Sequence, residues 1–274
     1  MRIALVQQRA GRVRSANRTR GTKAFEAAVR LGADLVVFPE LAFLPFLPRR
    51  RATPDALALA EPIPGPTTDV FAALAARTGV AVVLNLLERR RGRTYDSSPV
   101  IDGDGKLLGV TRMVHIMDGP GFRERGYYAP ATETDLVFET RAGRVGVCIC
   151  YDRHFPEYMR GLALAGAEVV VIPQAGVRGE WPDGLFEAEV RVAAFQNGYF
   201  AALANRVGRE GALEFEGGSF VAGPDGALIR RAPRGREAVL VADCDRTRLR
   251  ASHARRHFLP DRRPDFYRRL GLGD

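Results

Sequence analysis

The chain of 274 residues has little cysteine: three residues, with one tryptophan and four methionines. The cysteines form neither an even set, as a disulfide framework needs, nor a metal-ligand spacing. We therefore expect no disulfide, no metal site and a reducing compartment, the cytoplasm. No apolar run reaches the ~18 residues of a membrane span, and the apolar part of the N-terminus is too brief for a signal sequence. No phosphate-binding glycine loop occurs, and we expect no cofactor.

Lysine is also scarce. Only Lys23 and Lys106 are present, although the formal net charge is +9, so nearly all the basic residues are arginines. Arginines cluster at 49–51, 89–91 and 262–263. A nucleic-acid-binding protein needs a basic face with a recognisable module or an aromatic platform, and neither is visible here. We interpret the arginines as solvated surface charge and expect no nucleic-acid partner.

The chain has no linker, no composition break and no internal repeat, so we expect residues 1–274 to form a single α/β domain. Apolar runs and helical spacings predict its elements. Strands are expected at 2–8, 34–40, 80–89, 145–150, 167–176, 199–206 and 237–245, and helices from 17 to 31, after Thr67 or Thr68, after Pro156 and after Asp183. An Asp-Gly turn at 102–105 predicts a hairpin. Strands that alternate with helices and hairpins indicate a mixed sheet.

The segment 141–160 carries the clearest chemical signal. An apolar strand ends at Cys150, and Pro156 suits the first turn of a helix. Active sites collect at such strand ends in open α/β sheets, and nearby backbone N–H groups favour a thiolate. The alternative is that Cys150 is a small buried hydrophobe. We interpret Cys148, two residues earlier on the same strand face, and Cys244 in that way.

The stretch GVCICYDRHFPE (146–157) resembles the cysteine motif of the nitrilase superfamily, the carbon-nitrogen hydrolases. DLVVFPEL (34–41) and GKLLGVTRMVHI (105–116) resemble two further landmarks in the same order, and smaller echoes lie at 120–131, 202–208 and 217–226. The resemblance implies a four-layer α-β-β-α sandwich that associates as a homodimer or higher homo-oligomer. It also implies cysteine-dependent hydrolysis of a small amide or N-carbamoyl substrate.

On this resemblance Cys150 is the nucleophile and Glu40 the general base. The residues agree, because a glutamate at the mouth of a buried strand has its pKa raised by desolvation toward a useful range. The alternative for Glu40 is a cap or a surface ion pair. Glu124 matches a second glutamate that orients the substrate amide or holds a lysine. Its alternative is an exposed loop carboxylate beside Arg123 or Arg125.

The lysine of the family pattern is replaced by Met113, which carries no charge and donates no hydrogen bond. Three outcomes follow from this replacement. A backbone N–H after Cys150 carries the oxyanion, Arg112 substitutes through a one-residue bulge, or the protein is a catalytically silent small-molecule binder. Hydrolysis is the leading hypothesis, and the silent binder is its rival.

Two sequence features bear on the substrate. Arg153 occupies the place of an arginine that meets the substrate carboxylate in N-carbamoyl amino acid amidohydrolases, and a guanidinium fits a carboxylate well. The stretch 115–128 instead resembles N-carbamoylputrescine amidases, whose substrate is an amine. His115 and His154 are candidate pocket residues, with a structural role as the alternative for each.

Overall fold

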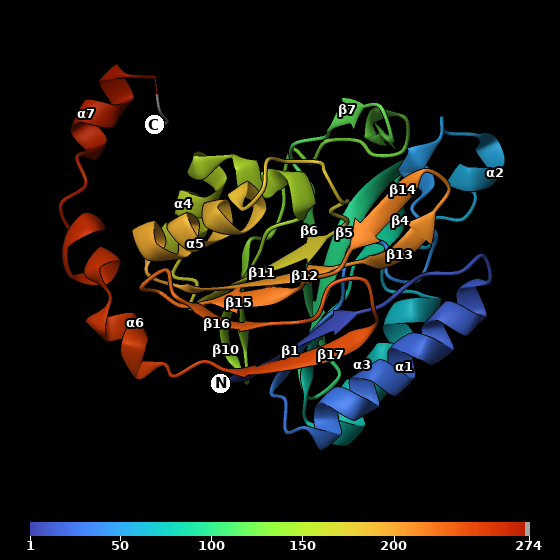
Figure 1. The fold of residues 1–274 in the computed structure, drawn as a ribbon, viewed down its shortest axis with the longest axis horizontal. Coiled ribbons are helices and arrows are strands. Elements are labelled where there is room, and N and C mark those ends of the chain that lie inside the picture. The colour runs from blue at the N-terminus through green and yellow to red at the C-terminus, as the bar shows by residue number, and fades with distance from the viewer. Residues whose placement is uncertain (272–274) are drawn as a thin grey trace.

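Two mixed β-sheets pack face to face, and helices cover the outer side of each (Figure 1). The structure is a computed structural model that describes residues 1–271. The strand order is β17-β1-β2-β3-β5-β4 in one sheet, with β6 paired to β5, and β16-β15-β12-β11-β10-β9 in the other. The four-layer α-β-β-α arrangement expected from the sequence is confirmed.

The first sheet consists of β1 (Arg2–Gln7), β2 (Leu35–Val37), β3 (Ala81–Val83), β4 (Leu86–Arg90), β5 (Arg93–Ile101), β6 (Leu107–Arg112) and β17 (Ala238–Asp243). The second consists of β9 (Val137–Thr140), β10 (Gly143–Val147), β11 (Val169–Gln174), β12 (Phe200–Asn205), β15 (Phe220–Ala222) and β16 (Leu228–Arg231). Two small hairpins pair β7 (Asp118–Gly119) with β8 (Phe122–Arg123) and β13 (Val207–Glu210) with β14 (Leu213–Glu216).

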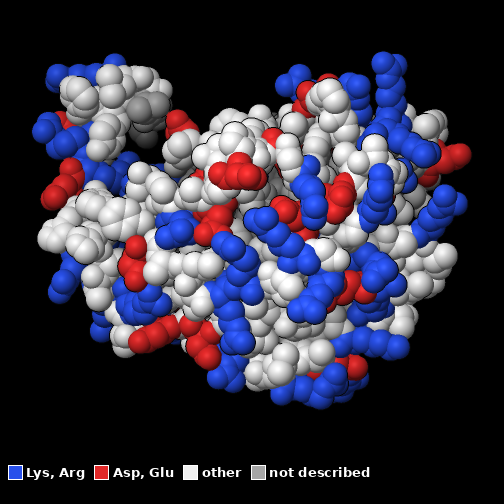
Figure 2. Space-filling view, viewed as in Figure 1, with Lys and Arg blue, Asp and Glu red and all other residues white. Residues whose placement is uncertain are grey.

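The longer helices are α1 (Arg14–Arg30), α3 (Pro66–Thr78), α4 (Pro156–Leu164) and α5 (Leu185–Asn197). Shorter ones are α2 (Pro54–Leu57), α6 (Thr247–Ala251) and α7 (Pro264–Arg269), with single turns at Leu47–Arg49, Glu124–Gly126, Cys150–His154 and Ala254–Phe258. None of the helices within residues 1–271 is long and apolar enough to cross a membrane. On the face shown in Figure 2, acidic side chains are interspersed among the arginines.

Three apolar clusters correspond to the three interfaces between the layers. One lies between the two sheets and includes Cys150 and Met113. A second lies between the first sheet and helices α1 and α3, and a third lies between the second sheet and helices α4 and α5. The candidate catalytic thiol therefore lies in the interface between the two sheets.

The predicted strand 80–89 forms two strands, β3 and β4, because its hydrogen-bond ladder to β5 is interrupted. Its two parts, β3 and β4, pair with β5 in a continuous antiparallel register. Leu84 and Asn85 interrupt the ladder, because Pro99 faces Leu84 and has no N–H to donate. The buried Asn85 side chain at this break bonds to the Leu41 N–H, to Asp96 and to Ser98.

Two predicted helix starts were wrong. Helix α3 begins at Pro66, with Gly65 as its N-cap, and the Thr68 hydroxyl accepts a hydrogen bond from the Gly65 N–H. Proline suits the first helical position because its missing N–H has no partner there in any case. Helix α5 has Gly184 as its N-cap, with a φ of 83° and no side-chain cap, so Asp183 does not cap it.

Gly21 in α1 generates a test of the packing against the first sheet. A Cβ at this position would lie 2.7 Å from the Phe43 ring and 3.3 Å from the rings of Phe38 and Phe71. We expect Gly21→Ala to lower the free energy of unfolding by about 1–3 kcal/mol, because overpacking exceeds the gain in helix propensity.

Gly161 in α4 is the matched control, since a Cβ there would meet nothing within 4 Å. Gly161→Ala should raise the free energy of unfolding by about 0.5–1 kcal/mol. Urea denaturation measures both variants. Equal stabilisation by the two alanines would contradict the packing described for α1.

Candidate active site

Cys150 lies on a tight turn rather than within a strand. Strand β10 ends at Val147, and Cys150 begins a single 3-10 turn with a φ of 43°, a strained value for a residue with a side chain. Cys150 belongs to the layer between the sheets, whereas Cys148 packs with the cluster under α4 and α5. The prediction that the two cysteines share a face was wrong, because the turn breaks the strand alternation on which it rested.

Glu40 lies on a second strained turn, separated from the end of β2 by Phe38 and Pro39. Leu41, the next residue, has a φ of 45°. Its N–H donates to Asn85 Oδ1 at 2.7 Å, and the Arg206 guanidinium donates to the carbonyl oxygens of Glu40 and Leu41. Asn85 and Arg206, both buried, therefore hold this turn through its backbone and leave the Glu40 carboxyl free.

The structure brings Glu40, Glu124 and Cys150 together, and all three are buried. Burial and the Glu124 charge raise the pKa of Glu40 to about 8. Burial also raises the pKa of Glu124 and that of the Cys150 thiol, which the charges of Glu40 and Glu124 raise further. Glu124 is therefore not the exposed loop carboxylate of the alternative interpretation. The resting thiol therefore stays protonated, beside the Glu40 carboxyl, whose pKa lies near neutral pH.

Asp96 and Tyr128 are two site residues that the sequence analysis missed. Asp96 in β5 is fully buried within hydrogen-bonding reach of Glu40, and burial raises its pKa, as does the Glu40 charge. The buried Tyr128 hydroxyl has its pKa raised by burial and by the charges of Asp96, Glu40, Glu124 and Cys150. The available signal was an aspartate in the otherwise uncharged run 94–101 of this strand.

Arg112 does not take the place of the missing lysine. Its guanidinium bonds both carboxylate oxygens of the buried Glu88, at 2.6 and 2.8 Å, and lies over the Tyr95 ring. The shift in register between β5 and β6 falls at Val100/Ile101, far from Arg112, which pairs with Ser97. The substitution considered from the sequence is therefore contradicted, because Arg112 keeps its ordinary strand orientation. Met113 is buried in the same cluster as Cys150.

One uncharged donor contacts the thiol, and a second belongs to the next residue along the chain. The Gln174 side-chain amide donates to Cys150 Sγ at 3.1 Å. The Tyr151 N–H, which follows the nucleophile, has no acceptor among residues 1–271 because it starts the 3-10 turn. An N–H group in this position is able to bind the oxyanion that forms on a substrate carbonyl oxygen when the sulfur attacks the carbonyl carbon.

Arg153 is buried beside the nucleophile. Its Nη1 donates to the Cys150 carbonyl at 3.2 Å, its Nε lies 3.4 Å from Glu189, and its guanidinium stacks on the Phe186 ring. Nη1 holds the Cys150 turn in place, whereas Nε and Nη2 are buried without a hydrogen-bond partner among the described residues. Binding of a substrate carboxylate by Arg153 stays a prediction.

The two candidate histidines each have a carboxylate partner. His115 Nδ1 lies 2.7 Å from Asp152, and the ring stacks on Phe155. His154 Nδ1 lies 2.7 Å from Glu189. Asp152 also accepts the N–H of His115, which joins the Cys150 turn to the segment after β6. The contacts of both side chains explain how the turn is positioned.

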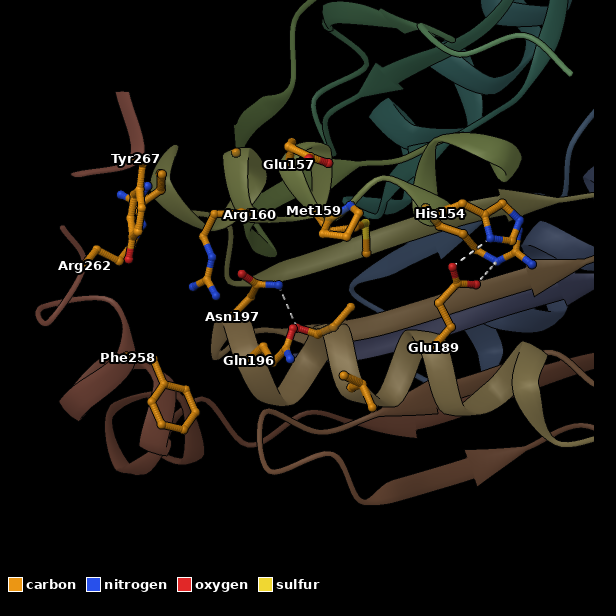
Figure 3. Close-up of a pocket in the computed structure, with 16 residues that line it drawn as sticks. His154, Glu157, Met159, Arg160, Glu189, Gln196, Asn197, Phe258, Arg262 and Tyr267 are labelled. Atoms are coloured by element: carbon orange, nitrogen blue, oxygen red, sulfur yellow. Dashed lines mark hydrogen bonds and ion pairs between the residues drawn. The ribbon is translucent and has the colours of Figure 1, made fainter. Parts of the chain in front are cut away.

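A surface cavity of about 560 Å³ lies between α4, α5 and the C-terminal segment. Figure 3 shows His154 and Glu189 directed toward each other at one end, with Phe258, Arg262 and Tyr267 at the other. Cys150, Glu40 and Glu124 do not line it. The candidate catalytic residues therefore lie in the interface between the sheets rather than in this cavity. Within residues 1–271, no three His, Cys, Asp or Glu side chains are arranged to hold a metal ion.

Comparison with known proteins gives consistent results. The sequence profile of the carbon-nitrogen hydrolases matches residues 2–254. An N-carbamoylputrescine amidase of Solanum lycopersicum is 34% identical over 270 residues, covering 93% of this chain and 90% of its own. A citrullinase of Francisella tularensis is 30% identical, covering 88% of this chain and 87% of its own.

Solved structures share the fold. A carbon-nitrogen hydrolase from Helicobacter pylori G27 superposes with a TM-score of 0.91 at 30% identity, covering 98% of both chains. A mutant amidase from Nesterenkonia sp. AN1, with an acetamide moiety covalently attached at its active-site cysteine, superposes with a TM-score of 0.81 at 25% identity. That match covers 98% of this chain and 96% of the amidase.

The geometry predicts that iodoacetamide alkylates Cys150 before Cys148 or Cys244. The Glu40 carboxyl has a pKa of about 8 and accepts a proton only when ionised, so the rate should rise as pH increases through about 8. Glu40→Gln should remove this rise and slow labelling about tenfold or more. Peptide mass spectrometry over a pH series measures both effects.

Glu61→Gln is the control, because Glu61 is buried but bonds to Thr67. It should leave the pH profile of alkylation unchanged. Equally fast labelling of Cys148, or an unaltered profile in Glu40→Gln, would show that Glu40 does not act on the thiol.

Proposed function

The chain belongs to the carbon-nitrogen hydrolase family, and we propose that it hydrolyses a C–N bond of a small amide or N-carbamoyl compound through a thioester on Cys150. The observation that carries this proposal is the meeting of two strained turns, one with the Cys150 thiol and one with the Glu40 carboxyl. Strain of this kind persists where the surrounding structure holds it, and it collects at active sites.

In the proposed reaction, ionised Glu40 takes the thiol proton as the sulfur attacks the carbonyl carbon. The oxyanion accepts hydrogen bonds from the Tyr151 N–H, and the protonated Glu40 then gives its proton to the departing nitrogen. Water attacks the thioester, Glu40 takes a proton from it, and the thiol is released with that proton. Glu124 orients the substrate amide.

We further propose that the substrate carries a positive charge. Carboxyl groups around the thiol outnumber guanidinium groups, and Glu180 also acts on the Cys150 thiol through its charge. Arg153 already contacts Glu189, and Arg206 contacts backbone carbonyls. Similarity to N-carbamoylputrescine amidases supports an N-carbamoyl amine. A homodimer or higher homo-oligomer, a single domain and a cytoplasmic location stay predictions.

The rival function is small-molecule binding without turnover. One observation favours it: Met113 supplies no charge where the family pattern has a lysine, and Arg112 is committed to Glu88. Loss of one oxyanion donor costs roughly 10²–10³ in rate, which leaves a slow enzyme rather than none. We therefore favour hydrolysis supported by the backbone donor.

Ammonia release across three matched N-carbamoyl compounds tests the substrate proposal. The compounds end in an ammonium, a neutral group or a carboxylate. We expect kcat/KM to be about tenfold higher for the ammonium compound than for the neutral one, which corresponds to about 1.4 kcal/mol. Glu180→Gln should raise KM for the ammonium compound alone, and Glu214→Gln, at an exposed residue paired with Arg178, is the control.

Arg153→Ala should lower kcat for all three compounds alike, because it loosens the Cys150 turn. A preference for the carboxylate compound that Arg153→Ala abolishes would instead assign Arg153 to substrate binding. Absence of ammonia release from every compound would favour the rival function.

Met113→Lys separates a slow enzyme from a silent binder. An ammonium at this position would face the carboxyl groups of the site, which offsets the cost of burying it. We expect the natural protein to have measurable turnover and the variant to turn over up to about 10²-fold faster. Turnover that appears only in the variant would support the silent binder, and far-ultraviolet circular dichroism checks that the variant folds.

A further inference from the structure

The carboxyl groups of Glu40 and Asp96 lie within hydrogen-bonding reach of each other in a fully buried site. Glu40 Oε1 and Oε2 and Asp96 Oδ2 have no donor among the described residues. Two ionised carboxylates are acceptors only, so they form no hydrogen bond and repel each other. A contact of this kind is stable when one of the two groups holds a proton.

Asn85 decides which oxygen of Asp96 is free to hold a proton. The Leu41 N–H can only donate, so the side-chain oxygen of Asn85 must accept from it. The Asn85 amide nitrogen therefore donates to Asp96 Oδ1, at 2.5 Å, and to the Ser98 hydroxyl, at 3.1 Å. Asp96 Oδ1 is an acceptor in this network, and the free oxygen Oδ2 is left for a proton directed at Glu40.

No cation in the described part of the chain supplies this hydrogen bond instead. The terminal nitrogens of Arg206 donate to carbonyl oxygens of the Glu40 turn and to Glu210. Arg112 is bound to Glu88, and Met113 is apolar. The other ionisable groups whose charges act on Glu40 or Asp96, or that lie next to them in the site, are Glu124, Cys150, Asp152 and Tyr128.

We propose that Asp96 is a positioning residue that stays protonated on Oδ2 and donates this hydrogen bond to the ionised Glu40, in place of the donor that Met113 does not provide. The inference rests on the proposed function for its use of Glu40 as the base of Cys150. A carboxylic acid donor to a carboxylate forms a strong, charge-assisted hydrogen bond. It stabilises ionised Glu40 without adding a buried positive charge. Burial, the Glu40 charge and the hydrogen bond to Glu40 all raise the pKa of Asp96, whereas the same hydrogen bond lowers the pKa of Glu40, so the proton stays on Asp96 while Glu40 ionises.

The pH dependence of Cys150 alkylation by iodoacetamide distinguishes this donor from an ionised Asp96. Asp96→Leu removes the donor, so the rise in alkylation rate near pH 8 should move upward by about one to two pH units. Asp96→Asn keeps an N–H donor, so the pH at which the rate rises should change much less than in Asp96→Leu. If Asp96 were ionised, both variants would remove a repelling charge and move the rise to lower pH, which would overturn the proposal.

Tyr128→Phe is the matched comparison, because the Tyr128 hydroxyl is buried, has no hydrogen-bond partner among residues 1–271 and is affected by the charges of Asp96 and Glu40. The pH at which the alkylation rate rises should be the same in Tyr128→Phe as in the natural protein. If that pH changes in Tyr128→Phe and not in Asp96→Leu, the hydrogen bond belongs to Tyr128 and the proposal is overturned.

Infrared spectroscopy observes the proton directly and requires no turnover. About one pH unit above the Glu40 pKa of about 8, the natural protein should show a protonated carboxyl band that both Asp96 variants lose. Glu124→Gln should retain this band. A spectrum unchanged in Asp96→Asn would overturn the proposal. Loss of the band in a protein that hydrolyses no amide would uphold the Asp96 proton while rejecting the proposed function.

Discussion

The site depends on the burial of acidic groups between two sheets without an ammonium among them. Desolvation disfavours the charged form of each group, so Glu40, Asp96, Glu124 and the Cys150 thiol all have raised pKa values. A buried charge without a partner is costly, and protonation removes that cost. The same burial that threatens stability therefore holds Glu40 near neutrality, where a general base is most useful.

Backbone strain is the second constraint, and distant residues support it. The turns at Leu41 and Cys150 have positive φ, which costs about 1–3 kcal/mol each for residues with side chains. Asn85 and Arg206 bind the first turn, and Arg153 binds the carbonyl of the second. Much of the buried polar network thus acts on the backbone and leaves the thiol and carboxyl free to react.

The sequence predicted the elements and the principal reactive residues better than their surroundings. Strands with continuous apolar runs and helices with clear spacing were found, and Glu40, Glu124 and Cys150 do meet in one buried site. The break at Leu84 was missed because it depends on Pro99 in the facing strand. The helix start before Thr67 was placed late because Gly65 and Pro66 together begin it.

Local pattern and motif order by themselves determined the fold class, the family resemblance and the absence of a lysine at Met113. Only the tertiary structure decided that Arg112 is bound to Glu88, that Cys148 and Cys150 lie in different layers, and that Asp96 faces Glu40. The reason is physical: strand alternation assigns a side chain to a face, but turns with positive φ and contacts between distant segments decide which groups meet there. Their protonation follows from that meeting.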